Sequence, residues 1–252
     1  MKILVPTKRV PDTDQKIVAT ADGSAVAIDH LPFVLNPFDA IALEEAVQIS
    51  ERDATGSVEV VAVGIGEADY QQQLRTALAM GATRAVCVEC NQALDPWNVA
   101  RLLNAMVERE RPALVLMGKQ AVDDDANQTG QFLAALLDWP QATFASRIEF
   151  QGSQVQVNRE TDHGIETVEL PLPAVVTVDL RLNEPRYASM AGIMKAKKKP
   201  LDVISANDLG VSLEPRVEVL RYQSADTARK CQRVGTVEEL AQQLLKLTGR
   251  SG

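Results

Sequence analysis

Residues 113–137 of this 252-residue chain read ALVLMGKQAVDDDANQTGQFLAALL and carry its strongest fold signal. The continuous apolar run at 113–117 is typical of a strand that is buried on both faces, and Gly118 ends it. The apolar face of residues 132–137 then predicts a helix. Strand, loop and helix in this order form one unit of an α/β sheet, whose ligands bind just beyond the strand ends.

The same alternation fills the rest of the first half of the chain. Short apolar runs predict buried strands, and apolar residues at three-to-four spacing predict helices between them. The strands are expected at residues 2–6, 58–63 and 85–89, and the helices at residues 38–53, 69–80 and 97–110. Asn36-Pro37 and Asp95-Pro96 each place a capping side chain before a proline at the first helical position. We therefore expect a doubly wound, mostly parallel α/β sheet of the Rossmann-like, nucleotide-binding kind.

The pattern changes after residue 146. Alternating apolar and polar residues predict a small antiparallel meander over residues 146–170, and the apolar run at 174–180 predicts a strand that rejoins the main sheet. Beyond Asn183 the periodicity fades into a loop, a lysine run and a polar stretch. A final helix begins with the capping box Thr236-x-x-Glu239. We expect an α/β domain over residues 1–185 and an extended C-terminal arm, with little core of its own, over residues 186–252.

Composition excludes several classes of protein. The net charge is −8, with 26 basic against 34 acidic residues, whereas a non-specific nucleic-acid binder needs a cationic surplus. Three cysteines and two histidines cannot support a disulfide scaffold or an ordinary zinc cluster. The apolar run at 3–5 is too short for a signal peptide, and no apolar stretch approaches the roughly 18 residues that cross a bilayer. We expect an intracellular protein that does not insert into a membrane.

The acidic loop at residues 118–131 is the leading candidate site. Its three consecutive aspartates would repel a phosphate, but they could accept hydrogen bonds from ribose hydroxyls. The backbone N–H groups of residues 126–129, at the positive end of the following helix, could bind a phosphate together with the Thr129 hydroxyl. The alternatives are a capped acidic loop before an ordinary helix and, with less support, a divalent-metal site.

Two other motifs have ambiguous meanings. Residues 64–69, GIGEAD, resemble an incomplete dinucleotide fingerprint and predict either a nucleotide contact or a plain tight turn. Cys87 and Cys90 have redox-motif spacing, but on a strand their side chains point to opposite faces, which favours buried cysteines. The common hydrolase and P-loop signatures do not occur in the sequence.

Lysines gather at one place in this acidic chain, at positions 195 and 197–199. The run predicts either a solvated loop or an electrostatic docking surface for an acidic partner. Met190, Ile193 and Met194 stand just upstream in a loop-like segment, and methionine suits adaptable docking surfaces.

Several blocks along nearly the whole chain resemble the β subunit of electron transfer flavoprotein. In order, they are KRV at 8–10, NPF at 36–38 with EEA at 44–46, TALAMGA at 76–82, GKQAVDDDANQTGQ at 118–131 continuing to LDWPQ at 137–141, and DLRLNEPRYA at 179–188 followed by IMKAKKK at 193–199. The resemblance implies a heterodimer with an electron transfer flavoprotein α subunit that holds most of the FAD. This chain would bind AMP and complete the flavin site.

The same resemblance implies an electron carrier without bond-making catalysis. It would accept electrons from acyl-CoA dehydrogenases and related flavin dehydrogenases and pass them to a membrane electron transfer flavoprotein-quinone oxidoreductase. The location would be the cytoplasm of a bacterium, or the mitochondrial matrix if the chain is eukaryotic. Alternatives are a bifurcating relative with a second FAD in place of AMP, which DDDANQTGQ disfavours, and a stand-alone nucleotide-binding α/β protein.

Family resemblance also assigns residues. AMP would contact Pro6, Asn36, Pro37, Phe38, Asp39, Ile65, Gly118, Lys119, Gln120, Ala121, Val122, Asp123, Asp124, Asp125, Ala126, Asn127, Gln128 and Thr129, with Phe38 near the flavin ring. Dehydrogenase partners would dock on a recognition loop anchored by Met190, with Tyr187, Ile193, Met194, Lys195, Lys197 and Lys198 in the same surface. The C-terminal arm would embrace the α subunit.

Overall fold

The computed structural model describes residues 1–224, 231 and 233–247. The chain divides into two units. The first comprises Met1–Lys16 and Ile28–Leu220, and the second comprises Ile17–Ala27 and Arg221–Gly252. The residues that the sequence analysis assigns to AMP binding and to the docking of dehydrogenases all belong to the first unit.

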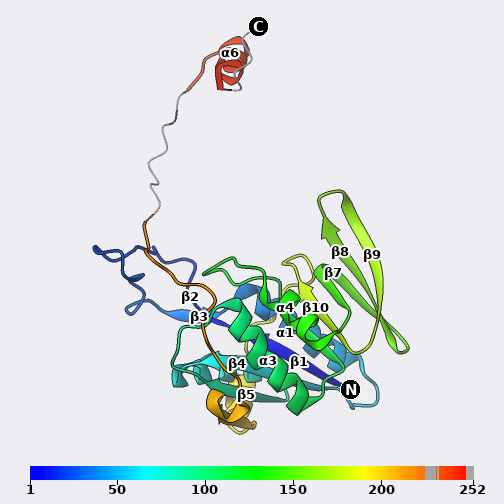
Figure 1. The fold of residues 1–252 in the computed structure, drawn as a ribbon. Helices are drawn as coiled ribbons and strands as arrows, with labels where there is room; N and C mark the ends of the chain where they lie inside the picture. Colours follow the sequence, from blue (N-terminus) through cyan, green and yellow to red (C-terminus); the bar gives the residue numbers. More distant parts are fainter. Residues whose placement is uncertain (225–230, 232, 248–252) are drawn as a thin grey trace. The chain divides into compact units, whose positions relative to one another are not determined.

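The first unit is built on a sheet that, in the described part of the chain, has nine strands in the order β11-β5-β4-β1-β6-β10-β7-β8-β9 (Figure 1). Their bounds are β1 (Lys2–Thr7), β4 (Glu59–Gly66), β5 (Arg84–Glu89), β6 (Leu114–Gly118), β7 (Gln141–Gln151), β8 (Gln154–Thr161), β9 (Gly164–Pro171), β10 (Ala174–Val178) and β11 (Leu201–Ser205). The pairs from β11 across to β7 are parallel, and only the β7–β8–β9 pairs are antiparallel. The mostly parallel α/β fold is therefore confirmed.

Helices cover both faces of this sheet. They are α1 (Pro37–Arg52), α2 (Gln71–Met80), α3 (Pro96–Glu110) and α4 (Thr129–Leu137). Along β1, Ile3 and Val5 pack with α1 and α2, whereas Leu4 packs on the other face with α3 and α4. Successive residues of a strand point to opposite faces, which explains why the central strands are apolar throughout.

Most predicted elements are confirmed to within a few residues. The meander is antiparallel as predicted, and β10 rejoins the main sheet between β6 and β7. Strand β7 begins earlier than expected, at Gln141, because its first residues pair in parallel with β10 before a register shift. A short 3₁₀ turn, η1 (Ala68–Tyr70), precedes α2 where one continuous helix was predicted.

The main difference from the sequence prediction lies after residue 183. The expected loop contains a helix, α5 (Met190–Ala196), and the polar stretch contains β11, which pairs with β5 at the sheet edge and leads into the 3₁₀ turn η2 (Ala206–Leu209). The seven residues of α5 are too few to display a helical period. Edge strand β11 is only partly buried, so it lacks the continuous apolar run that marks the inner strands.

A second, antiparallel sheet of β2 (Arg9–Pro11) and β3 (Phe33–Leu35) also belongs to the first unit. In the second unit, Tyr222 N donates to Gly23 O, and α6 (Val237–Leu247) begins with the predicted cap, since Thr236 Oγ1 accepts a hydrogen bond from Glu239 N. Among the described residues, no helix is long and apolar enough to span a membrane.

Candidate functional site

A pocket of about 730 Å³ opens at the carboxyl ends of β1, β4, β5 and β6. The chain order reverses at this point, because β4 and β5 lie on one side of β1 and β6 lies on the other. Such a reversal separates the loops that follow neighbouring strands and leaves a crevice between them. The volume falls within the range of about 300–1,000 Å³ that is typical of small-molecule sites. The pocket is therefore a candidate ligand site, and it opens at strand ends that the sequence analysis singled out.

Asp39, in the first turn of α1, joins the ends of two strands. Its carboxylate accepts hydrogen bonds from Lys8 N at 2.8 Å and from Gly118 N at 3.1 Å. Burial raises the pKa of Asp39 to about 7, although these hydrogen bonds favour the ionised form. A buried carboxyl group thus holds the start of the acidic loop against the end of β1.

Asn36 does not cap α1 as predicted. Its side chain instead holds the acidic loop, since Asn36 Nδ2 donates to Gln120 O at 2.9 Å and Asn36 Oδ1 accepts from Val122 N at 3.2 Å. By contrast, Asp95 caps α3 as expected, accepting a hydrogen bond from Asn98 N at 2.8 Å. The Asn36 side chain binds a segment more than 80 residues away in the chain. The local sequence around Asn36 cannot reveal such a partner.

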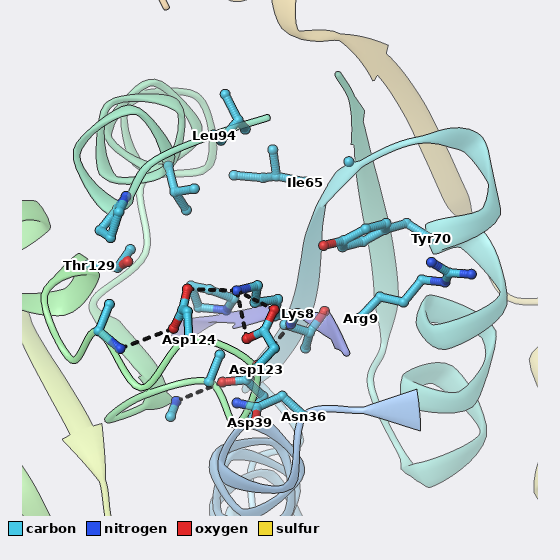
Figure 2. Close-up of a pocket in the computed structure, with 18 of the residues that line it drawn as sticks. Lys8, Arg9, Asn36, Asp39, Ile65, Tyr70, Leu94, Asp123, Asp124 and Thr129 are labelled. Carbon is cyan, nitrogen blue, oxygen red and sulfur yellow. Dashed lines mark hydrogen bonds and ion pairs between the residues drawn. The ribbon is translucent and has the colours of Figure 1, made fainter. Parts of the chain in front are cut away.

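Lys8 neutralises part of the acidic loop. Its ammonium group lies 2.8 Å from an Asp123 carboxylate oxygen and 2.9 Å from Asp124 Oδ2, as Figure 2 shows. Burial alone would lower the pKa of Lys8, but the two carboxylates outweigh burial and raise it. The aspartates that would repel a phosphate are thus paired with the cation of Lys8, the residue directly after β1. The sequence analysis missed this partner.

The loop enters α4 through two residues with left-handed backbone, Asp125 (φ 49°) and Asn127 (φ 48°). Asp and Asn tolerate this conformation better than other non-glycine residues. Asp124 Oδ1 accepts a hydrogen bond from Ala126 N, but no described side chain caps α4 at Gln128. The backbone N–H groups in the first turn of α4 are therefore not bonded to a capping side chain and are available to a ligand. Thr129, in the same turn, lines the pocket.

The far wall of the pocket is mostly apolar or aromatic. Ile65 lies at the end of β4 and Leu94 in the loop after β5, and Tyr70 and Arg9 approach from another side (Figure 2). The Arg9 guanidinium lies 3.5 Å from the centroid of the Phe33 ring. Burial raises the pKa of Tyr70. The sequence pointed to Ile65 alone of these residues, although the strand-end rule would also have indicated Leu94.

The structure brings most of the predicted nucleotide residues together. Those that line the pocket are Pro6, Asn36, Asp39, Ile65, Gly118, Lys119, Gln120, Ala121, Asp123, Asp124, Ala126, Asn127, Gln128 and Thr129. Pro37, Phe38, Val122 and Asp125 do not line it. Val122 and Asp125 instead brace the loop, through Val122 N on Asn36 and through an Asp125 oxygen that accepts from Gln120 Nε2.

Phe38, which the family resemblance places near a flavin, is only 6% exposed. Lys119 lies beside it, with Nζ 5.4 Å from the Phe38 ring centroid and 4.7 Å from that of Phe144. The same ammonium pairs with Asp179 at 2.7 Å. The Lys119 charge is thus already balanced within this chain.

Of the two ambiguous sequence motifs, the cysteine pair belongs to the core, whereas residues 65–67 of the GIGEAD stretch line the pocket. Cys87 and Cys90 are buried in the clusters on opposite faces of the sheet, as predicted, and burial raises the pKa of Cys87 to about 11. Gly66, with φ 155°, has room for no side chain, since a Cβ there would lie 2.3 Å from the Tyr70 ring. Among the described residues, no cluster of His, Cys, Asp or Glu could hold a metal ion.

The predicted docking residues lie on and beside α5. Tyr187 is 97% exposed, Met190 77%, Met194 61% and Ile193 40%. Three lysines of the run, Lys195, Lys197 and Lys198, are also exposed. Lys199 differs, because its ammonium donates to Leu78 O at 2.9 Å and to Ala82 O at 2.6 Å. It anchors the segment and belongs to the packing of the chain.

Comparisons with known proteins identify the family. A family model described as the electron transfer flavoprotein domain matches residues 24–209. Electron transfer flavoprotein subunit beta of Bradyrhizobium diazoefficiens is 48% identical over 249 residues, and that of Bos taurus is 47% identical over 251, covering 99% and 98% of each chain. The mitochondrial subunit beta of Arabidopsis thaliana is 46% identical over 246 residues and 97% of each chain. The chain therefore belongs to the electron transfer flavoprotein family, as one of its β subunits.

Proposed function

We propose that this chain binds AMP, completes the FAD site of its α subunit and docks flavin dehydrogenases that supply electrons. Family membership gives the coarse role, because a β subunit pairs with an α subunit in flavin-dependent electron transfer. The flavin, when bound, supplies the electron-accepting chemistry. We assign this chain no bond-making step: its side chains bind, pack and dock.

The observation that carries the AMP proposal is the braced acidic loop at the switch point of the sheet. Asp39, Asn36 and Lys8 hold the loop in place at the edge of the pocket. The uncapped start of α4 and Thr129 supply donors that suit a phosphate. Ile65 and Leu94 supply apolar surface that suits an adenine ring. The donor set therefore fits an adenylate.

The proposed electron donors are acyl-CoA dehydrogenases and related flavin dehydrogenases. Exposed Met190 and Met194 can adapt to an apolar patch on such a partner, and the three exposed lysines favour an acidic border around it. The proposed acceptor is a membrane electron transfer flavoprotein-quinone oxidoreductase. We propose the bacterial cytoplasm or, for a eukaryotic chain, the mitochondrial matrix as the compartment. Within residues 186–252, we propose that the C-terminal arm, which follows the recognition loop, packs on the α subunit.

Nucleotide analysis of the heterodimer tests the site. The chain is co-expressed with its α subunit, and the purified complex is denatured and its nucleotides are separated by chromatography. We expect one FAD and one AMP per heterodimer. Two FAD molecules without AMP would support a bifurcating protein instead, and a complex without a second nucleotide would overturn the AMP proposal.

Electron transfer from a dehydrogenase tests the docking surface. Met190→Ala should slow reduction of the heterodimer flavin by an acyl-CoA-reduced acyl-CoA dehydrogenase by about tenfold, as for truncation of an interface anchor. Flavin content and reduction by dithionite should stay unchanged, because neither requires docking. Equal rates for Met190→Ala and the wild type would refute the anchor role.

A further inference from the structure

Two arginines hold the docking segment, residues 187–198, at its two ends. Arg186 precedes the segment and binds to α1, and Arg75, a residue of α2, binds to its far end. We propose that they are positioning residues, which present α5 to the electron donor in one preset arrangement. The inference rests on the proposed docking function of Met190 and its neighbours. It adds the residues that determine where this surface lies.

At the leading end, Arg186 is clamped by two glutamates of α1. Arg186 Nε and Nη2 donate to Glu44 at 2.8 and 3.0 Å, and Nη1 and Nη2 donate to Glu51 at 2.6 and 2.9 Å. The backbone N–H of Arg186 also donates to Glu44, at 3.1 Å. Residues 44 and 51 are two helical turns apart, so both carboxylates face the same guanidinium. The fork geometry of arginine suits this double bidentate contact, which lysine could not reproduce.

Asn183 strengthens the same end. Its Nδ2 donates to Ile41 O at 3.1 Å and to Glu45 Oε2 at 3.1 Å. Glu44 and Glu45 are both buried. Buried carboxylates require partners, and α1 itself supplies only Gln48 to Glu44 and a 3.8 Å contact from Arg52 to Glu45. Residues 183–186 supply the remaining hydrogen bonds to these two carboxylates.

At the trailing end, α2 holds the segment. Arg75 Nη1 donates to Ala196 O at 2.8 Å and to Lys199 O at 2.9 Å. Lys199 Nζ in turn donates to Leu78 O near the end of α2 and to Ala82 O just beyond it. Gly192 permits the close approach, since a Cβ there would lie 2.6 Å from Ala79 O. Ala196, at the end of α5, is buried in the core.

These contacts matter because α5 cannot maintain its own shape. Isolated helices shorter than about 12–15 residues are marginal in water, and α5 has seven. Its large apolar side chains, Met190, Ile193 and Met194, are exposed, so apart from Ala196 the helix gains little stability from burial. A surface that is ordered before binding avoids the entropy cost of ordering it in the complex. The two clamps therefore provide the preorganisation that the short helix lacks.

The test uses the complete heterodimer and the kinetics of flavin reduction by an acyl-CoA-reduced acyl-CoA dehydrogenase. Arg186→Gln and Arg75→Gln are compared with Arg186→Lys and with Arg147→Gln, an exposed arginine paired with Glu149 of its own strand. We expect the KM for the heterodimer to rise by about tenfold in both glutamine variants, with a smaller change in kcat. The KM of Arg186→Lys should lie between those of the glutamine variants and the wild type. The KM of Arg147→Gln should equal that of the wild type.

Dithionite reduction and nucleotide content provide the second readout. Both should be unchanged in the glutamine variants, whereas a general structural defect would alter them together with KM and would overturn the proposal. If Arg186→Gln does not assemble, Glu51→Gln removes only the exposed half of the clamp, and it must still raise KM. An unchanged KM in the assembled variants would refute the positioning role.

Met190→Ala separates the two levels of the argument. If Met190→Ala raises KM and the arginine variants do not, the clamps are unimportant while the docking surface stands. If Met190→Ala and the arginine variants all leave KM unchanged, the docking function itself fails, and the positioning role fails with it.

Discussion

Replacing Gly118 by alanine measures how closely α1 must approach the end of β6. A Cβ at this position would lie 2.4 Å from Asp39 Oδ1, 2.7 Å from Phe38 Cβ and 2.9 Å from the Phe38 carbonyl carbon. The last of these atoms is backbone in the first turn of α1, so a side-chain rotation cannot relieve the clash. The start of the helix must move away from the strand.

Two costs follow from that movement. Overpacking of this kind costs about 1–3 kcal/mol. Displacing Asp39 also breaks its 3.1 Å hydrogen bond from Gly118 N, and a hydrogen bond to a charged group contributes about 1.5–3 kcal/mol. Because one shift causes both losses, they do not simply add, and we expect about 3 kcal/mol in total. At about 2–4 °C per kcal/mol, the melting temperature should fall by about 6–12 °C.

The assay is thermal melting of the heterodimer at pH 8 and at one fixed protein concentration, since association contributes to its stability. Nucleotide content is measured on the same samples, and we expect the variant to lose AMP because its loop is no longer held to β1. Gly64→Ala is the matched control. It lies near the end of β4, on the other side of β1, where the atoms nearest to a Cβ would be side-chain atoms of Tyr70 at 3.2 Å and of Leu74 at 3.4 Å. Equal melting temperatures and equal nucleotide content in Gly118→Ala and Gly64→Ala would refute the reasoning.

Three further predictions concern the same unit. Lys8→Gln leaves two aspartates without their cation and should weaken AMP binding by about tenfold in equilibrium dialysis, whereas Lys16→Gln, at an exposed site, should not. Burial raises the pKa of Asp39 to about 7 from an ordinary 3.8, so its contribution to stability is complete below about pH 4 and is lost as the pH rises through 7. The melting temperature of the wild type should therefore fall relative to Asp39→Asn between pH 5 and 8, and a constant difference would contradict this. Cys87 and Cys90 should resist alkylation at pH 8 until the protein is unfolded, and peptide mapping of the native protein that finds either one labelled would disprove their burial.

The strands and helices that the sequence predicted well are those with the most burial. Central strands such as β1 and β6 are enclosed on both faces, so their runs of Val, Ile and Leu mark them without reference to any other segment. Strand β11 and helix α5 escaped prediction for the opposite reason. One is a partly buried edge, and the other is short and largely exposed, so neither has the periodic pattern that burial imposes.

Capping shows the same division on a smaller scale. Asp95 and Asn36 both precede a proline at the start of a helix, and only Asp95 caps its helix. The Asn36 side chain is occupied by Gln120 and Val122, far along the chain. Identical local signals thus have different outcomes, because a long-range partner competes for one of the two side chains.

From the sequence alone, the alternation of strands and helices determined the fold class and pointed to the edge of the sheet at which the pocket opens. Hydrophobic period is a local property, and burial imposes it on each segment separately. Only the tertiary structure decided that Lys8 neutralises the acidic loop and that Glu44 and Glu51 grip Arg186. These groups are more than 100 residues apart in the chain, and their pairing depends on the path by which the folded backbone brings charges together.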